Sequence, residues 1–416
     1  MSGPIATGRG TAEDSPDRYP PISAIDSYPY WKRPDPYWAA GYWSAPAVFS
    51  PRFTEHRDVD ELTDATLWVQ TTDLLDPASD EGAKAMRTCL RSPSVHRILS
   101  ILDGLHHANT AQLVAWSASS ASNRSLRFVP MFDVGLVERG RYAAGHKHVG
   151  KQTYLWKLHD GKPIRRYTGL LPPDTARRIF ANLPPRHHAG GPHARHDLLT
   201  VEASLRLMEV QPAWIAASPE HATGPVALTN DKDDPGHYTG DIALWRDDGL
   251  RVVIEVCASR NLDHHAAKME KWASWLAGRS IDDTGVVVVF LNAHRDNHRH
   301  VAGQLRKMHA EIISPGTLRR HSGQRPLADP EAVQRARSQV MVAAWEDWFP
   351  PHHAVSESAV DLVCAYTANG KTWGTVSLAD AAAYPFRPTI TAPKPHDWLL
   401  TPPWAGQAPL TTPNVA

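Results

Sequence analysis

The sequence is short of cysteine, of long apolar runs and of net charge. Its three cysteines in 416 residues are Cys89, Cys257 and Cys364, too few and too scattered for a disulfide framework or a thiolate zinc site. No run is long and apolar enough to cross a bilayer, and the N-terminus lacks the basic-then-apolar order of a secretory signal. These absences predict a soluble cytoplasmic protein without a membrane partner.

The balanced charge and the absence of several known motifs exclude further classes of protein. Lys and Arg number 44, and Asp and Glu also number 44, so any nucleic-acid-binding surface has to be local. We find no Gly-rich phosphate loop, no internal repeat and no order of Ser, His and Asp that is typical of a hydrolase. The length allows two or three domains.

The most informative stretch runs from Tyr238 to Trp275. Residues 240–245, GDIALW, predict a strand with Asp241 at its start, and the following RDDG predicts a tight turn. Residues 250–256, LRVVIEV, predict a second strand that is buried on both faces and carries Glu255 near its end. A buried carboxylate needs a metal, a cation or hydrogen-bond donors, and Asp241 is near enough to share one with Glu255.

Two carboxylates on adjacent strands supply the hard oxygen ligands that Mg²⁺ prefers, and this arrangement would suit phosphodiester hydrolysis. The competing interpretation is structural, with Asp241 capping a strand and Glu255 paired to a basic neighbour. The flanking segments bear on this choice. They predict an apolar helix over residues 196–209 that carries Glu202, a helix over residues 262–276 that carries Lys268, and a buried strand over residues 285–292.

With this order of elements the chain resembles the PD-(D/E)XK, or restriction-endonuclease-like, superfamily. The resemblance implies an αβββαβ domain with Mg²⁺ as cofactor and with Asp241 and Glu255 as metal ligands. It also implies a catalytic role for Glu202, which would hold a second metal or a water. The chain departs from the pattern at Cys257, where the superfamily has a lysine. Some members carry that lysine on the following helix, which would give Lys268 the task of orienting the nucleophile; the alternative is a solvated helical lysine.

A narrower resemblance is to the replication-relaxation family of plasmid and integrative-element proteins. It implies a winged helix followed by a degenerate nuclease-like domain. The matching segments are HDLLTVEASLRL (196–207), GDIALW (240–245), VVIEVCAS (252–259), KMEKW (268–272) and VVVVFLNAHRDNHRH (286–300).

A separate pattern precedes these segments. The chain is predicted to become helical from Asp80, and within residues 94–140 apolar residues at three-and-four spacing predict three successive helical segments, with Asn109 and Thr110 as caps of the second. A strand is predicted to begin at residues 135–137, and its partner lies within KHVGKQTYLWKL (147–158). A helix-turn-helix followed by a hairpin resembles a winged helix.

The same region holds a local basic excess. Residues 97–166 contain 11 Lys and Arg against 4 Asp and Glu, which predicts salt-sensitive binding of DNA phosphates. The alternative is a winged helix that docks to protein and has a merely solvated basic face. The predicted DNA contacts are Arg124 and Arg127 on the recognition helix, and Arg139, Arg141, Lys147 and Lys151 on the wing or its flank.

The chain ends are rich in proline. The N-terminal segment is also rich in aromatic residues, so we expect it to pack onto a folded domain of its own chain. The alternative is a surface that stacks exposed bases. The residues that would test this alternative are Tyr30, Trp31, Tyr37, Trp38, Tyr42 and Trp43. Four histidines, at 187, 188, 193 and 196, favour a solvated linker over a zinc site, because no cysteine accompanies them.

The predicted architecture is a mixed α/β protein, a winged helix-turn-helix domain followed by an αβββαβ domain, with Pro- and aromatic-rich extensions. The predicted boundaries are 1–56 for the N-terminal extension, 80–168 for the winged helix, 169–192 for a linker, 193–315 for the nuclease-like domain, 316–385 for a helix plus hairpin appendage and 386–416 for the tail.

Three functions are compatible with this architecture. The first is a DNA-binding accessory protein of plasmid or mobile-element replication or transfer, with DNA and the other proteins of a DNA-processing complex as partners. The second is a Mg²⁺-dependent DNA endonuclease, and the third is a protein-interaction module. Cys257 places the binding protein ahead of the endonuclease, and the local basic excess speaks against the third.

Overall fold

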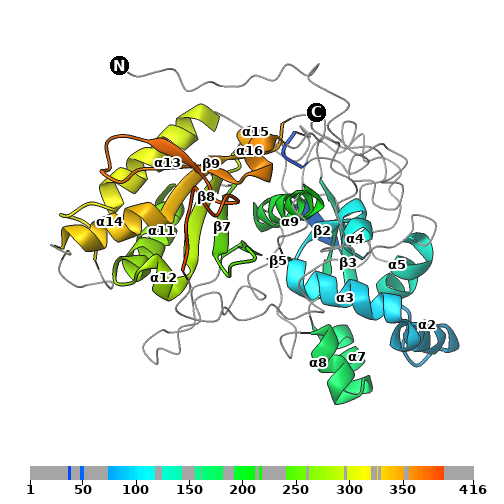
Figure 1. The fold of residues 1–416 in the computed structure, drawn as a ribbon. Coiled ribbons are helices and arrows are strands. Elements are labelled where there is room, and N and C mark those ends of the chain that lie inside the picture. Colours follow the sequence, from blue (N-terminus) through cyan, green and yellow to red (C-terminus); the bar gives the residue numbers. More distant parts are fainter. Residues whose placement is uncertain are drawn as a thin grey trace, which may run out of the picture.

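The computed structural model describes residues 36–38, 47–50, 74–117, 124–142, 155–159, 161–180, 192–210, 215–217, 240–258, 262–294, 298–319, 326, 329–350 and 356–387. They form a mixed α/β fold with a small sheet and a large sheet. The long helix α9 (Pro192–Val210) lies between the helices of the N-terminal part and the large sheet (Figure 1).

The N-terminal part combines helices with a four-stranded antiparallel sheet. Its strands are, in spatial order, β1 (Ala47–Ser50), β3 (Val137–Tyr142), β4 (Leu155–Leu158) and β2 (Ala108–Asn109). Its first four helices are α2 (Asp80–Arg91), α3 (Pro93–Leu105), α4 (Thr110–Ser117) and α5 (Arg124–Asp133). The helices and the β3–β4 pair expected from the sequence are therefore present.

Local signals in the sequence explain where α4 begins. The side chain of Asn109 accepts a hydrogen bond from the Gln112 backbone N–H at 2.8 Å, and the Gln112 side chain accepts one from the Asn109 backbone N–H at 3.0 Å. This reciprocal pair satisfies two backbone donors that a helix start leaves without partners. The cap predicted at Asn109 is confirmed.

The segment expected to be a linker, residues 169–192, is partly helical. Helix α7 (Lys162–Leu170) is followed by α8 (Pro173–Ile179), which starts directly after Pro172. Proline in the first turn of a helix loses no hydrogen bond, so a proline pair that suggests irregular backbone begins a helix here. Ala176 and Ile179 of α8 are buried in the core.

The large sheet has seven strands, in the order β11-β10-β9-β8-β7-β6-β5. The strands β5 (Ile215–Ala217), β6 (Ile242–Trp245) and β7 (Arg251–Cys257) are antiparallel neighbours, and β8 (Val286–Asn292) runs parallel to β7. The RDDG turn joins β6 to β7 and closes at Gly249, whose φ is 92°. The strands, helix and strand predicted over residues 240–292 are confirmed.

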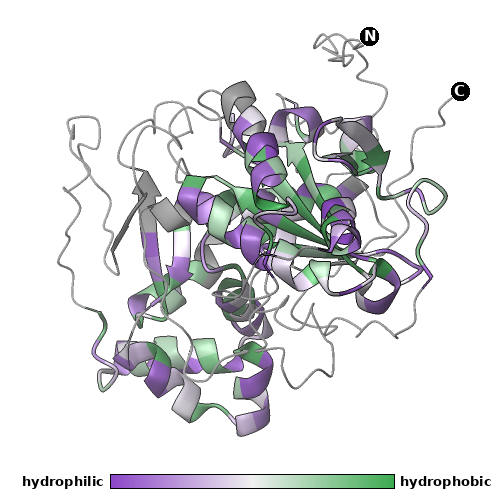
Figure 2. Cartoon of the chain, turned by 90° about the vertical axis from the view of Figure 1, so that its left-hand side faces the viewer, coloured by the Kyte–Doolittle hydropathy of each residue, from purple (hydrophilic) through white to green (hydrophobic). Residues whose placement is uncertain are grey.

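The two faces of this sheet are covered by different helices. On one face Ile242, Ile254 and Val256 belong to the apolar cluster that includes α9. On the other face Val253 and Cys257 pack with α11 (Leu262–Ala277), α13 (His298–Ile312) and α14 (Pro330–Gln339). Figure 2 shows the hydrophobic strands enclosed by helices. The nearly continuous β-branched runs follow from burial on both faces.

Asp329 and Pro330 open an apolar pattern that predicts a single helix over residues 329–349, but the structure divides this segment. Helix α14 ends at Gln339, and β9 (Val340–Ala344) then pairs parallel to β8. Pairing with a buried strand overrides the helical pattern of this apolar run. The short helix α15 (Trp345–Trp348) follows β9.

The hairpin predicted beyond residue 356 is present as β10 (Val363–Tyr366) and β11 (Gly374–Ser377). The strands extend the large sheet through β9, so the segment continues the sheet of the preceding region. An Asn-Gly pair in a hairpin predicts a type I′ turn, which needs a positive φ at both residues, and at Asn369-Gly370 this prediction is wrong. Gly370 alone has a positive φ, and the Asn369 carboxamide instead accepts hydrogen bonds from the backbone N–H groups of Lys371 and Thr372.

The described residues of the N-terminal extension pack on the chain itself. Tyr37 is fully buried and stacks on Trp345, with ring centroids 5.4 Å apart, and its hydroxyl donates to Glu346. The Trp38 indole donates to the carbonyl of Phe349 at 2.9 Å. For these two aromatic residues, packing on the chain's own fold is confirmed, whereas the other four that would test base stacking lie outside the described residues.

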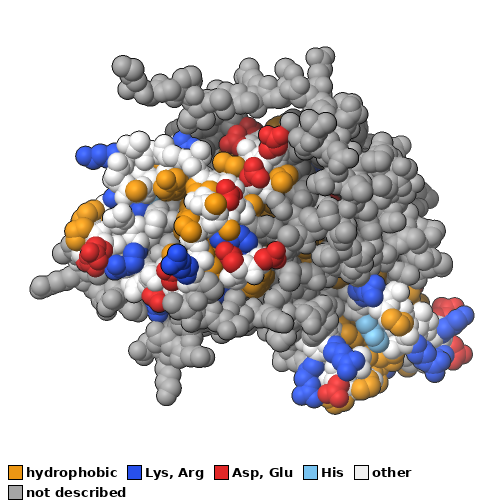
Figure 3. Space-filling view, in the orientation of Figure 1, with side chains coloured by type: hydrophobic (Ala, Val, Ile, Leu, Met, Phe, Trp, Pro, Cys, Tyr) orange, Lys and Arg blue, Asp and Glu red, His pale blue; other side chains and the backbone are white. Residues whose placement is uncertain are grey.

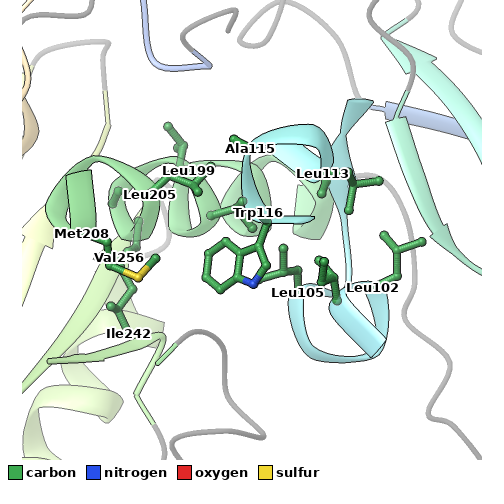
Figure 4. Packing of buried hydrophobic residues seen from close by; sticks show 14 of the residues in the cluster. Leu102, Leu105, Leu113, Ala115, Trp116, Leu199, Leu205, Met208, Ile242 and Val256 are labelled. Carbon is green, nitrogen blue, oxygen red and sulfur yellow. The ribbon is translucent and has the colours of Figure 1, made fainter. Parts of the chain in front are cut away.

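Helix α9 joins both parts of the fold through apolar contacts. Leu199, Leu205 and Met208 are at most 2 % exposed. Trp116 of α4 lies beside α9, and the same cluster continues to Ile242 and Val256 of the large sheet (Figure 4). The N-terminal helices and the large sheet therefore share one core.

Two absences apply to the described part of the chain. No described helix is long and apolar enough to span a membrane. All three cysteines are free and buried.

His309 of α13 predicts a pH dependence of stability. Its Nε2 donates to the carbonyl of Val340 at 2.9 Å, which leaves Nδ1 as a buried acceptor that has no partner among the described residues. Burial lowers the pKa of His309 from 6.5 to about 4. The hydrogen bond to Val340 raises this pKa, and the positive charge of Arg337 lowers it further. Because the pKa of His309 is lower in the folded than in the unfolded protein, protonation favours unfolding. The contribution of neutral His309 to the free energy of unfolding is therefore complete above pH 6.5 and is lost as the pH falls toward 4.

We expect the free energy of unfolding of the wild type to fall more steeply between pH 7 and pH 4 than that of His309→Gln, by about 2–3 kcal/mol over the range. Glutamine keeps a donor for Val340 and does not titrate. Urea unfolding at a series of pH values measures the difference. Equal pH slopes for the two proteins would contradict the buried, neutral His309.

Candidate functional site

The predicted carboxylates come together with a lysine at the edge of strands β6 and β7. Asp241 immediately precedes β6, and its backbone N–H donates to the carbonyl of Ile254 at 3.0 Å. This register sets Asp241 beside Glu255 of β7. Both carboxylates are at most 2 % exposed. Their burial requires compensation, because unpaired charge in a low-dielectric interior is costly.

Helix α11 supplies most of the compensation for Glu255. Lys268 Nζ lies 2.6 Å from Oε2 of Glu255, and the Trp272 indole donates to Oε1 at 2.7 Å. Residues four apart lie on the same face of a helix, so Lys268 and Trp272 hold the two oxygens of one carboxylate. Lys268 also lies 3.5 Å from Oδ1 of Asp241, so one ammonium serves both carboxylates.

The second oxygen of Asp241 is held from two other directions. Oδ2 accepts a hydrogen bond from the Val256 backbone N–H at 2.6 Å and lies 3.0 Å from Nε2 of His196. His196 is in the first half of α9, and its side chain is 28 % exposed. Oδ1 of Asp241 accepts no hydrogen bond from any described residue, and the nearby cation is Lys268, at 3.5 Å.

The chain of polar contacts continues into the N-terminal part. Nδ1 of His196 lies 3.2 Å from Oδ1 of Asp197, and Oδ2 of Asp197 makes a short contact with Nδ1 of His107, which follows α3. Basic and acidic groups therefore alternate from Glu255 through Lys268, Asp241 and His196 to Asp197. The α9 backbone connects the two parts at this point.

The pKa values follow from these contacts. Burial opposes ionisation of Asp241, but the nearby His196 and Lys268 and the hydrogen bond from Val256 hold its pKa well below the usual range. The pKa of Asp197 is lowered for the same kind of reason, because His107 and His196 outweigh its burial. Burial alone would lower the pKa of His196, yet the two aspartates raise it to about 10.

Glu255 differs from its neighbours. Burial raises its pKa, Lys268 opposes the rise and Asp241 adds to it, with a result of about 7. The site therefore holds one firmly ionised carboxylate, Asp241, and one whose proton is loosely held near neutral pH. Such a pair beside a cation is typical of functional sites, although structural ion pairs also shift pKa values.

Glu202 does not join this group of side chains. Its Oε1 accepts from Arg206 at 3.0 Å, and its Oε2 accepts from Gln112 of α4 at 3.2 Å. Gln112 also donates to the carbonyl of Leu198. Glu202 thus helps to attach α9 to the N-terminal helices, while His196, one and a half turns earlier, is the α9 side chain that reaches Asp241.

Cys257 lies two residues after Glu255 and on the same face of β7. It is buried among the apolar residues under α11, and burial raises the pKa of its thiol. Lys268 reaches the carboxylates from α11 instead. This is the arrangement implied by a lysine carried on the following helix.

The structure describes few of the predicted DNA-contacting side chains. Arg124 and Arg127 lie in α5 and Arg141 lies in β3, but only their backbone is described, and Lys147 and Lys151 lie outside the described residues. Arg139 of β3 has its guanidinium 4.9 Å from the ring centroid of Phe132.

His196, Asp197 and Trp272 are site residues that the sequence pattern does not predict. The available signals were an acidic residue directly after a histidine near a helix start, and the one-turn spacing between Lys268 and Trp272 in KMEKW. The spacing of residues 187–196 instead places His196 with the histidines of the predicted linker. Its role depends on the packing of α9 against β6, which the sequence pattern does not contain.

No protein-family model, curated protein or solved structure matches this chain. The resemblances drawn from sequence segments stay predictions.

The donor types at the site suit Mg²⁺. The carboxylates of Asp241 and Glu255 offer the hard oxygen donors that this ion prefers, and Oδ1 of Asp241 is a buried oxygen that accepts no hydrogen bond from a described residue. Among the described residues, no group of three or more His, Cys, Asp or Glu side chains is arranged to hold a metal ion. Two carboxylates are nonetheless a usual protein contribution to a Mg²⁺ site, because this ion keeps several waters.

The lysine bridge predicts a specific loss of stability. In Lys268→Met, the two carboxylates lose their shared cation, and we expect the free energy of unfolding to fall by about 2–4 kcal/mol at neutral pH. The matched control is Lys271→Met on the exposed face of the same helix, for which a change within about 0.5 kcal/mol is expected. Urea unfolding of the three proteins measures both values, and equal losses in the two variants would argue against the bridge.

Proposed function

We propose that this chain is a DNA-binding accessory protein of plasmid or mobile-element replication or transfer, built from a winged helix and a nuclease-like domain. The observation that carries the proposal is the order α3, β2, α4, α5, β3, β4, with β4 pairing to both β3 and β2. In a winged helix, the helix that corresponds to α5 enters the major groove and the hairpin contacts the flanking backbone.

The local charge supports the same proposal. Six Lys and Arg lie on these elements against three Asp and Glu, and counterion release favours binding of phosphates to such a region; the basic residues are Arg97, Arg124, Arg127, Arg139, Arg141 and Lys157. For the second domain, support comes from the order α9, β5, β6, β7, α11, β8, with three antiparallel strands and a parallel fourth. Apart from the four-residue helix α12 (Ile281–Thr284) between α11 and β8, this order agrees with the αβββαβ order that the PD-(D/E)XK resemblance implies, which supports the proposal.

A second candidate, a Mg²⁺-dependent DNA endonuclease, is favoured by one observation. Lys268 bridges Asp241 and Glu255, so the lysine absent at Cys257 is supplied by α11. Asp241 and Glu255 would hold the ion, which when bound polarises a phosphodiester and promotes ionisation of a water. Lys268 would orient that water, and His196 would keep Asp241 ionised and in place.

The first test concerns the winged helix. Arg124→Ala combined with Arg127→Ala is expected to weaken binding of a labelled DNA duplex and to reduce the slope of log affinity against log salt by about 2, because each phosphate contact contributes about 0.9. Fluorescence anisotropy over a salt series measures both quantities.

Lys268→Ala is the control, with a smaller expected effect on binding. Three outcomes would contradict the proposal: no binding by the wild type, affinity that survives high salt, or a larger loss from Lys268→Ala than from the arginine pair.

The second test separates the two candidates. For an endonuclease, supercoiled plasmid is nicked with Mg²⁺ and not with chelator, the activity is lost in Asp241→Asn and Glu255→Gln, and it is weakened in Lys268→Ala. DNA binding by these variants stays close to that of the wild type. Agarose-gel nicking and anisotropy are measured on the same preparations. Binding without nicking by the wild type leaves a binding protein whose acidic site is a relic of a nuclease.

A further inference from the structure

Helices α7 and α8 carry a concentration of positive charge that lies outside the predicted DNA contacts. Between Lys162 and Ile179 there are five basic residues and a single acidic one, Asp174. All five basic residues are exposed. Figure 3 shows Lys and Arg side chains on the surface over these helices and over the neighbouring α2. We call this set the α7–α8 basic surface; its members are Lys162, Arg165, Arg166, Arg177 and Arg178.

Most of these cations have no partner within the described part of the chain. Lys162, Arg165, Arg166 and Arg178 make no ion pair or hydrogen bond through their side chains to any described residue, whereas Arg177 pairs with Asp174 at 3.0 Å. Both members of that pair are more than two-thirds exposed, so solvent weakens it. The surface thus offers positive charge that the described residues leave largely unneutralised.

The helices that carry this charge are firmly attached. Ile164 and Tyr167 of α7 are at most 2 % exposed, and the Tyr167 hydroxyl donates to the carbonyl of Cys89 in α2. Ile179 of α8 and the adjacent Phe180 belong to the same core as α3. The arginines therefore project from fixed helices, which reduces the entropy lost when they bind a ligand.

The chemistry of this surface favours phosphate over a protein partner. One arginine guanidinium can bind two phosphate oxygens at once, and this surface carries four arginines, Arg165, Arg166, Arg177 and Arg178. A protein interface normally has a buried apolar or aromatic centre. Leu170, 53 % exposed, is the single large apolar side chain classed as exposed on these two helices.

We propose that the α7–α8 basic surface is a second DNA-contacting site, which binds the phosphate backbone beside the duplex held by the winged helix. The inference rests on the proposed DNA binding and assigns part of it to residues beyond the winged helix. Because α7 and α8 are packed on α2 and α3, this surface keeps a constant position relative to α4 and α5. It contacts backbone and no base edges, so it adds affinity without sequence preference.

The test variant is Arg165→Gln with Arg166→Gln and Arg178→Gln, compared with the wild type and with a control that removes three charges from exposed positions elsewhere. The control is Lys307→Gln with Arg319→Gln and Arg387→Gln. On a fluorescein-labelled duplex, the test variant is expected to bind at least about tenfold more weakly and to have a salt slope smaller by about 2–3, whereas the control stays close to the wild type. Circular dichroism melts check that all three proteins are folded.

The outcomes separate this inference from the proposed function. If the wild type binds no DNA, the proposed function fails. If the wild type binds and the test variant has the same affinity and slope, only the second site fails. Equal losses in the test and control variants would also overturn it, because they would reflect net charge alone.

A crosslinking measurement tests whether bound DNA lies next to the α7–α8 basic surface. The native cysteines are buried, so Arg166→Cys introduces an exposed thiol that can carry a photocrosslinker. Crosslinking to the duplex is expected from Arg166→Cys and not from Lys307→Cys. Absence of a crosslink from Arg166→Cys, while the labelled protein still binds DNA, would overturn the proposal.

Discussion

The burial of helix α9 is the constraint on which the rest of the structure depends. One side of the helix completes the apolar layer of the large sheet, and another is covered by α4 with Trp116. A helix shared in this way brings its polar residues into the interior as well, and each must find a partner there. Glu202 accepts hydrogen bonds from Nε of Arg206 and from the Gln112 side chain, and Glu202 and Arg206 are at most 1 % exposed.

The candidate site follows from the same constraint. Because α9 is packed against β6, His196 reaches Asp241, and because α11 covers the opposite face of β7, Lys268 and Trp272 reach Glu255. The carboxylates are thus compensated from both sides of the sheet. Replacing one partner would leave an unpaired charge in the low-dielectric interior. The ionisation of the two carboxylates therefore depends on the positions of α9 and α11.

The position of helix α11 alters the interpretation of Cys257. The PD-(D/E)XK pattern that the sequence resembles has a lysine at this position, so a cysteine there argues against catalysis. In three dimensions the strand position is filled with an apolar, buried thiol, and the ammonium enters from a neighbouring helix at 2.6 Å from Glu255. The alternation of charge continues through His196 and Asp197 to His107, so the site is also in polar contact with the N-terminal part.

The sequence by itself determined the elements whose signals are local. Alternation and β-branched runs predicted β6, β7 and β8, the apolar spacing of residues 196–209 predicted α9, and Asn109 marked the start of α4. The approach of Asp241 to Glu255 also followed, since a two-strand hairpin sets its own register. Only the tertiary structure decided that Val340–Ala344 is a strand, that α9 contributes His196 and not Glu202, and that Lys268 and Trp272 share one carboxylate. These outcomes depend on which face of a helix meets which strand, and that is set by the burial of the whole core and not by spacing along the chain.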